Sequence, residues 1–228
     1  MKNKTILHFT GMISTKYGAL ERFFLCCVEC SKALGFNTVL QYEELPWSKT
    51  YLDDLDKAGA ELILKPINTG ALGASSNIYS ILSSVKPDVV NVHFVEPLER
   101  LMIALMARLI RARRTVAMVH NKPEWNTKRL GALIFNLYDY VLPVSDSVKD
   151  SLVIGGVQKR KIHTHYLGVY VKGERSLEIR NNIRKQLNIP EEAILLSTIA
   201  FDAPFKGLDI LLNALSIVVT KRPDVYWM

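Results

Sequence analysis

The sequence predicts an α/β protein, a Rossmann-like doubly wound parallel sheet followed by an incomplete second domain of the same type. Apolar segments of strand length alternate with longer amphipathic segments, which is typical of parallel βαβ units. The segment VVNVH at 89–93 is apolar at most positions, as in a strand buried on both faces. Apolar residues make up 49% of the 228 positions, which is enough for a core and excludes intrinsic disorder.

The first predicted domain, residues 1–170, has a regular order of elements. Gly35 and Gly59 each follow a helix, Pro87 stops one, and Pro97 lies in the first turn of another. Ser145 is a predicted helix cap. Strands are expected at 5–9, 38–41, 62–64, 89–93, 115–119, 140–144 and 162–165, and helices at 19–34, 51–58, 77–85, 97–112, 127–137 and 146–154.

A charged, glycine-containing linker is expected at 168–176, and a new series of elements follows it. One strand–helix unit and the opening of a further strand are too little for an independent doubly wound domain. We therefore expect residues 171–228 to be the truncated start of a second domain, and the sequence to be a fragment. The expected elements are helices at 177–187 and 208–220 and strands at 193–199 and 225–228.

Composition and charge limit the classes of partner and the location. The formal net charge is +7, which can attract phosphates, anionic lipid or nucleic acid, or can reflect ordinary solubility. No nucleic-acid-binding motif is visible, so no nucleic-acid partner is expected. A cytoplasmic location is expected because the sequence has no membrane-length apolar stretch and no secretion signal, and its three cysteines are clustered in one segment.

Two glycine-containing turns are candidate phosphate sites, because ligands of such sheets bind beyond the carboxyl ends of the strands. Gly18 opens the first long helix, where backbone N–H groups can approach a phosphate, although the loop is neither a P-loop nor a dinucleotide fingerprint. Lys206 and Gly207 follow a later strand and can bind a diphosphate, or they can be a solvated lysine beside a turn glycine.

Two histidines end buried strands at the same edge of the sheet. His120 can donate a hydrogen bond to a substrate hydroxyl or carbonyl, or it can be a structural residue, and His93 has the same two interpretations. No partner is identifiable for the other histidines, which are His8, His163 and His165. Cys26 and Cys30 share a helix face but have no second ligand pair, so no metal site is expected.

The predicted helix at 97–112 has a basic side. Arg100, Arg108 and Arg111 fall within about 80° of one another at 100° per residue. Such a helix can lie on an anionic membrane surface, or it can cover the sheet with its arginines in solvent. The apolar side consists of Leu98, Leu101, Leu105 and Leu109.

Together the loops resemble glycosyltransferase family 4, whose members have the GT-B fold of two facing Rossmann-like domains. The resemblance covers nearly the whole chain, and each match is short, but their order and spacing are specific. The matching segments are YGALER at 17–22, KPDVVNVH at 86–93, VHN at 119–121, VSDSV at 144–148, LGV at 167–169 and KGLD at 206–209.

The resemblance implies a sugar transferase that uses a nucleotide-sugar donor and a glycan or lipid-linked acceptor, needs no cofactor or metal, and retains anomeric configuration. It implies Gly18 near the donor diphosphate, with Lys206 and Gly207 binding that diphosphate, and His120 as the catalytic residue beside the transferred sugar. It also implies an acceptor-side group, which consists of His93, Glu21 and Arg22. Peripheral contact with the inner face of the membrane is a further expectation.

The sequence departs from the family pattern in ways that suggest an incomplete enzyme. The family's glycine-arginine pair is replaced by residues 200–202, its entry aspartate by Tyr170, and its paired glutamates fall beyond residue 228. We therefore expect this chain alone to be a poor catalyst. The alternative is a non-catalytic module that binds an acceptor or a partner. A phosphatase or dehydrogenase is disfavoured because their motifs are missing.

Overall fold

The computed structural model describes residues 4–123, 128–168, 176–200 and 204–228. The chain divides into two compact units, Met1–Val169 and Tyr170–Met228, and each is described by itself. Most of the expected linker at 168–176, including Tyr170, and most of the departure at 200–202 lie outside the described residues.

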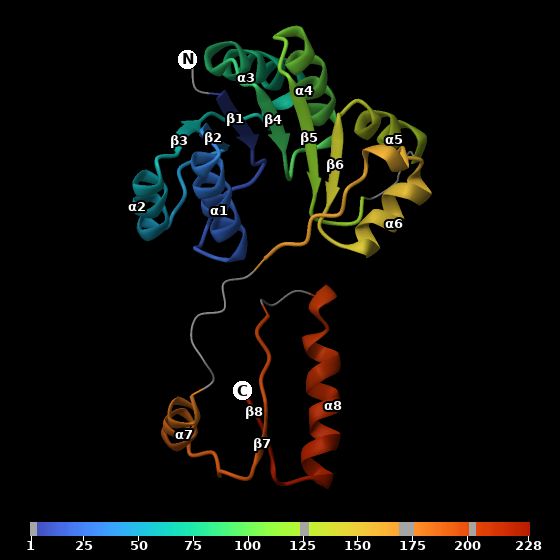
Figure 1. Cartoon of the computed structure of the whole chain (residues 1–228). Coiled ribbons are helices and arrows are strands. Elements are labelled where there is room, and N and C mark those ends of the chain that lie inside the picture. Colours follow the sequence, from blue (N-terminus) through green and yellow to red (C-terminus); the bar gives the residue numbers. More distant parts are fainter. Residues whose placement is uncertain (1–3, 124–127, 169–175, 201–203) are drawn as a thin grey trace. The chain divides into compact units, whose positions relative to one another are not determined.

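The first unit contains a six-stranded parallel sheet in the order β3-β2-β1-β4-β5-β6 (Figure 1). The order reverses between β1 and β4, as in a doubly wound sheet, so the predicted fold class is confirmed. The strands are β1 (Lys4–Phe9), β2 (Phe36–Tyr42), β3 (Glu61–Leu64), β4 (Val89–Val92), β5 (Arg114–Val119) and β6 (Tyr140–Pro143).

The seventh strand expected at 162–165 is wrong. Ile162 forms only an isolated bridge with Val141. The N–H groups of His163 and His165 donate to carbonyls of β6, but this pairing is too short to form a continuous ladder. The segment therefore runs beside the edge of the sheet as an extended loop.

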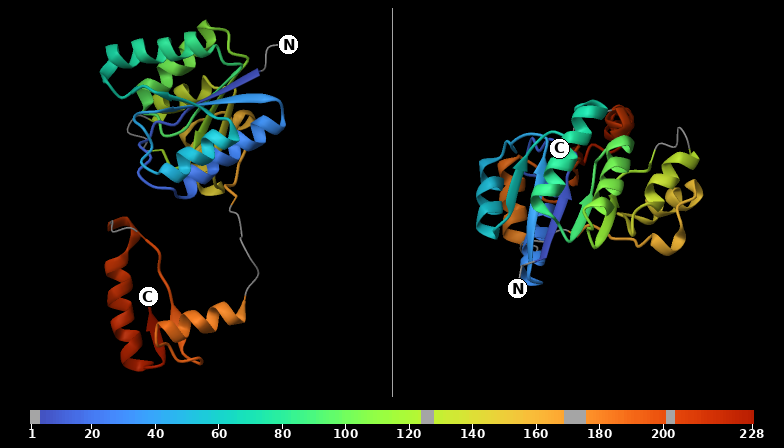
Figure 2. Two further views of the ribbon diagram at one scale, coloured as in Figure 1. Left: turned by 90° about the vertical axis from the view of Figure 1, so that its left-hand side faces the viewer. Right: turned by 90° about the horizontal axis from the view of Figure 1, so that it is seen from above.

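Helices cover both faces of this sheet (Figure 2). The helices are α1 (Ala19–Ala33), α2 (Lys49–Ala58), α3 (Gly70–Val85), α4 (Pro97–Leu109), α5 (Lys128–Asn136) and α6 (Asp146–Gly155), with a short 3-10 turn η1 (Lys159–Lys161). Leu40 of β2 packs with α1 and α2 in one apolar cluster, while Val39 belongs to another cluster with α3 and α4, because neighbouring strand residues face opposite sides. None of the helices in the described ranges is long and apolar enough to cross a membrane.

The ends of these helices follow local chemistry. Gly59 closes α2 in the left-handed conformation with φ +87°, and the Ser145 hydroxyl accepts a hydrogen bond from the Val148 N–H at 3.3 Å, as predicted. In contrast, α3 begins seven residues before its expected start at residue 77. Its first turns contain Gly70 and Gly73, whose low helix propensity hides the helix from sequence reasoning.

The buried side of α4 also differs from the expected leucine side. The residues that face the core are Glu99, Ile103, Ala104 and Ala107. Leu98, Leu105 and Leu109 are instead 46%, 52% and 73% exposed. Small alanine side chains let α4 approach its neighbours closely, so packing selects them over the larger leucines.

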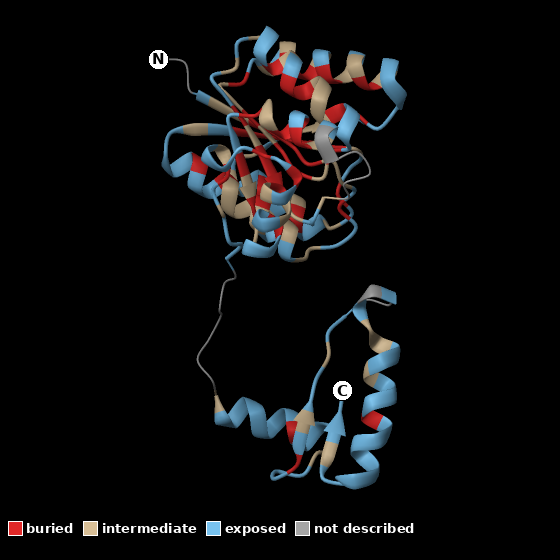
Figure 3. Cartoon of the chain, turned by 90° about the vertical axis from the view of Figure 1, so that its right-hand side faces the viewer, coloured by how far each residue is buried: buried red, intermediate tan, exposed pale blue. Residues whose placement is uncertain are grey.

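The second unit contains a single βαβ element. Its strands, β7 (Ile194–Leu196) and β8 (Val225–Trp227), pair in parallel, and α8 (Leu208–Lys221) connects them. Helix α7 (Leu177–Gln186) precedes them, and the 3-10 turn η2 (Pro204–Lys206) leads into α8. Most of this unit is exposed (Figure 3), and Ala193 and Leu215 are its buried apolar residues in the described part.

Candidate functional site

Three histidines form a hydrogen-bonded chain across neighbouring strands of the first unit. His8 lies in β1, His93 directly follows β4, and His120 directly follows β5. The His8 Nδ1 and His93 Nε2 atoms are 3.0 Å apart, and the His93 Nδ1 and His120 Nε2 atoms are 3.1 Å apart. The expectation that His8 has no partner is therefore wrong. Strand order decides this contact, because β4 lies between β1 and β5 although the three are far apart in sequence.

Aromatic packing holds these rings, of which His8 and His93 are buried and His120 is partly buried. The rings of His8 and His93 stack at 5.3 Å, and Phe24 of α1 meets the ring of His93 edge-on at 4.8 Å. Phe94 stacks on His120 at 4.3 Å between ring centroids. Burial lowers the pKa of His8 and of His120 to about 4, and it holds the pKa of His93 well below its ordinary value. All three imidazoles are therefore neutral near neutral pH.

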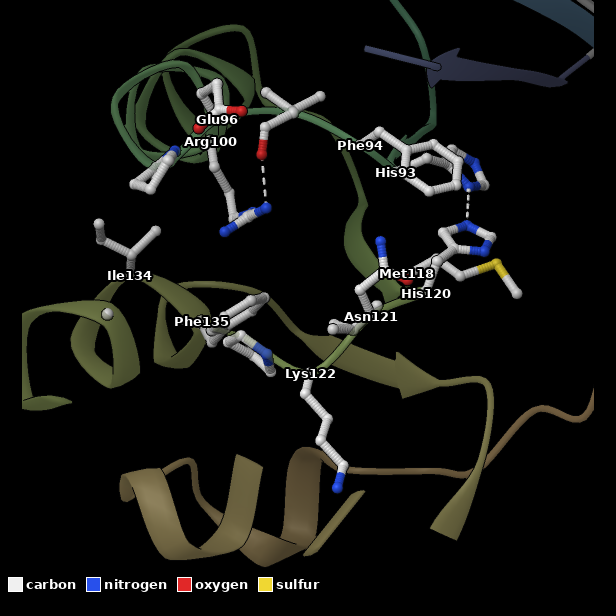
Figure 4. A pocket seen from close by; sticks show the side chains of 15 residues that line it. His93, Phe94, Glu96, Arg100, Met118, His120, Asn121, Lys122, Ile134 and Phe135 are labelled. Carbon is white, nitrogen blue, oxygen red and sulfur yellow. Dashed lines mark hydrogen bonds between the residues drawn. The ribbon is translucent and has the colours of Figure 1, made fainter. Parts of the chain in front are cut away.

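His120 lines a cavity of about 560 Å³ at the carboxyl edge of β4 and β5 (Figure 4). This is where doubly wound sheets bind ligands, and the volume lies in the range of small-molecule sites. Asn121 and Lys122 on the loop after β5 also line it, while Phe135 of α5 contributes an apolar wall. The cavity therefore combines a neutral histidine, an amide and apolar surface.

Sequence reasoning missed Arg100, which also lines this cavity. Its guanidinium donates to the Val95 carbonyl and lies 4.7 Å from the ring centroid of Phe135, so it is not part of a solvated basic face. Burial lowers the pKa of Arg100. The position of Arg100 in the sequence could have identified it as a site residue, because the first turns of a helix that follows a strand lie at the ligand edge of the sheet. Arg108 likewise donates to the carbonyls of Ala104 and Leu137.

Gly11 brings the loop after β1 onto the loop after β4, and sequence reasoning overlooked it in favour of Gly18. Its φ is +61°, and a Cβ there would lie 2.6 Å from the carbonyl carbon of Phe94. Both the backbone conformation and the close approach require glycine. The sequence signal that could have identified Gly11 is its position two residues after the end of a predicted strand.

The family model for Glycosyltransferase Family 4 matches residues 48–172, more than half of the chain. The chain belongs to glycosyltransferase family 4. The match includes the loops that contain His93 and His120, so the cavity lies within the family's domain. The recognition made from the sequence motifs is confirmed.

Several solved structures are similar over nearly the whole family 4 chain at low sequence identity. HepE of Anabaena, solved in complex with UDP and glucose, is 17% identical with a TM-score of 0.70 over 99% of this chain. A glycosyltransferase from Rickettsia africae is 15% identical with a TM-score of 0.72 over the full chain. The lipopolysaccharide outer core galactosyltransferase WaaB is 14% identical with a TM-score of 0.61 over 97% of this chain.

These relationships cover only part of each related protein. The chain spans 60% of the length of HepE, 68% of the Rickettsia protein and 67% of WaaB. No curated protein matches this chain.

In the family 4 chain, Glu21 organises the loop in which Gly18 lies. Gly18 is the N-cap of α1, and its N–H donates to Glu21 Oε2 at 2.9 Å. The hydroxyl of Ser14 donates to Glu21 Oε1 at 2.8 Å, so both oxygens of this buried carboxylate hold the loop. Arg22 is exposed, and its guanidinium lies 5.4 Å from the ring centroid of Tyr17.

Lys206 and Gly207 lie in the second unit. Gly207 is the N-cap of α8 in the left-handed conformation, with φ +65°. Lys206 directly precedes it at the end of η2, with an exposed side chain. The first free N–H groups of α8 are at this end, as anion recognition by a helix N-terminus requires.

Within the described ranges, no group of three or more His, Cys, Asp or Glu side chains could hold a metal ion. The histidine chain illustrates the reason. His93 contacts each neighbour through a different ring nitrogen, so the three rings form a line and do not converge on one point.

Proposed function

We propose that this family 4 chain transfers a sugar from a nucleotide-sugar donor to a glycan or lipid-linked acceptor, with retention of configuration and without a bound metal. The observation that carries this proposal is the cavity lined by His120 at the carboxyl edge of the sheet. It is supported by the solved structures of HepE, which contain UDP, glucose or UDP-glucose. WaaB, a lipopolysaccharide outer core galactosyltransferase, supports an acceptor in polysaccharide or glycolipid assembly.

The proposed roles follow from the chemistry of each group. His120 bonds a hydroxyl of the transferred sugar and needs no proton uptake, because burial keeps its imidazole neutral. Gly18 provides the N-terminus of α1 for the donor diphosphate. Lys206 and Gly207 neutralise the departing nucleoside diphosphate as its negative charge develops.

The acceptor enters the cavity from the side of α4 in this proposal. Arg100 and Asn121 offer N–H donors to acceptor oxygens, and Phe135 offers an apolar surface to a sugar ring or lipid. His93 contributes to the acceptor side through its hydrogen bond to His120. Glu21 contributes by holding the loop that contains Gly18. Arg22 is an exposed cation at the start of α1 that can contact acceptor oxygens.

Peripheral contact with the inner face of the membrane completes the proposal. Because Arg108 bonds to backbone carbonyls of its own unit, the contact depends on the exposed leucines of α4. Mixing the chain with anionic phospholipid vesicles and sedimenting them tests this directly. The double variant Leu105→Ser with Leu109→Ser is expected to bind the vesicles less than the wild type. If neither protein sediments with the vesicles, the proposed membrane contact is refuted.

A transfer assay with a panel of UDP- and GDP-sugars and glycan acceptors tests the function. We expect only slow transfer from this chain, whose residues 200–202 depart from the family's phosphate-binding pair. His120→Ala should lower that transfer by about a hundredfold, the typical effect of removing a hydrogen-bond donor from the transition state. His163→Ala is the control, because His163 is an exposed histidine outside the cavity. Calorimetry separates the alternative function: acceptor binding without donor binding supports a non-catalytic module, and binding of neither contradicts both.

A further inference from the structure

The histidine chain constrains where each ring carries its proton. His8 lies on β1, and His93 and His120 directly follow β4 and β5, in the part of the sheet where these three strands are neighbours. His93 and His120 line the cavity, and His8 does not. A neutral imidazole has one N–H donor and one bare nitrogen that accepts. Since burial keeps all three rings neutral, each N···N contact joins one donor to one acceptor.

Only two proton arrangements satisfy both contacts. If His93 donates from Nδ1 to His120, its Nε2 must accept from His8, and all three rings carry the proton on Nδ1. If His93 donates from Nε2 to His8, its Nδ1 must accept from His120, and all three carry the proton on Nε2. The rings therefore share one tautomer and can change it only together.

The environment of His8, at the buried end of the histidine chain, distinguishes the two proton arrangements. His8 Nε2 is buried and has no hydrogen-bond partner in the described part of the chain. In the second arrangement this atom would be an N–H donor with no acceptor, and orphaned buried N–H groups are rare and costly. In the first arrangement it is only a bare ring nitrogen, so the first is favoured.

We propose that His8 and His93 are positioning residues that hold His120 as its Nδ1–H tautomer. His120 Nε2 is occupied by the bond to His93, so Nδ1–H is the group left for a ligand. The Nδ1–H bond lies in the ring plane, so that ligand must approach the ring edge, and Phe94 covers one face of the ring. The matching ligand group is an oxygen that accepts a hydrogen bond, such as a sugar hydroxyl. The identity of that oxygen rests on the proposed function, whereas the tautomer does not.

Nitrogen-15 spectroscopy of the full chain with labelled histidines tests the tautomer without any substrate. Long-range proton–nitrogen correlations separate Nδ1–H, Nε2–H and doubly protonated rings. At neutral pH we expect His8, His93 and His120 to show the Nδ1–H pattern, and the exposed His163 to show averaged tautomers. An Nε2–H or averaged pattern at His120 overturns the proposal.

Two substitutions at His93 test whether this residue sets the His120 tautomer. The amide of His93→Asn occupies the place of Nδ1 and can donate or accept there, so it keeps a contact with His120 but breaks the link to His8. The amide of His93→Gln occupies the place of Nε2 and keeps only the contact with His8. His120 is expected to lose its pure Nδ1–H pattern in both variants. An unchanged Nδ1–H pattern in both overturns the proposal, and the wild-type spectrum decides if neither variant folds. Failure of the transfer assay with the expected tautomer would contradict only the proposed function.

Discussion

The N–H of Gly18 and the Oε2 of Glu21 lie 2.9 Å apart, so the first helix begins with a buried carboxylate that holds its own N-terminal loop. We expect Glu21→Ala to lower the free energy of unfolding by about 1–3 kcal/mol, because the Ser14 hydroxyl and the Gly18 N–H lose their acceptor. Urea denaturation measures this change. Glu29→Ala, an exposed glutamate on the same helix, is the control, and equal effects of the two variants would contradict a structural role for Glu21.

Gly11 and Gly35 form a matched pair for testing the close approach of two loops. Both have positive φ, at +61° and +77°, but only a Cβ at Gly11 would contact backbone atoms closer than 3 Å. We expect Gly35→Ala to cost about 1 kcal/mol and Gly11→Ala about 1–3 kcal/mol more, because only the second adds a clash. Denaturation midpoints of both variants measure the difference. Equal midpoints would show that the loops separate freely.

Stability should depend on pH through the buried histidines. The pKa of His8 is lowered to about 4, so the unfolded chain binds more protons than the folded chain between that value and the ordinary 6.5. The contribution of neutral His8 to the free energy of unfolding is fully present above about pH 6.5. It is lost as the pH falls towards 4, and the loss reaches up to roughly 3 kcal/mol for this residue. Denaturation at a series of pH values should show a shallower loss for His8→Gln than for wild type. His163→Gln should follow the wild-type curve, and parallel curves for all three would refute the assignment.

Arg100 should affect the acceptor more than the donor. Arg100→Met keeps the side-chain stem beside Phe135 but removes the guanidinium from the cavity. We expect the acceptor KM to rise about tenfold with a nearly unchanged donor KM, which corresponds to the loss of one charged hydrogen bond. Steady-state kinetics with each substrate varied in turn measures this. Arg111→Met, at an exposed position after α4, should change neither KM, and an effect confined to the donor would contradict the acceptor role.

The sequence is enough to predict the alternation of strands and helices, because side-chain periodicity and glycine, proline and serine at element ends act locally. It therefore predicted six strands of the sheet, the cap at Ser145 and the stop at Gly59, and its short motifs predicted the family. It also drew attention to His93 and His120, since a residue that directly follows a buried strand must lie at the ligand edge.

Which of these residues meet, however, depends on the tertiary fold. The order of strands brings His8 to His93, and the packing of alanines rather than leucines turns Arg100 of α4 towards Phe135. The tight approach at Gly11 likewise depends on a loop more than eighty positions away. These contacts join residues distant in sequence, and they result from close packing of the whole sheet and its helices, which no local pattern encodes.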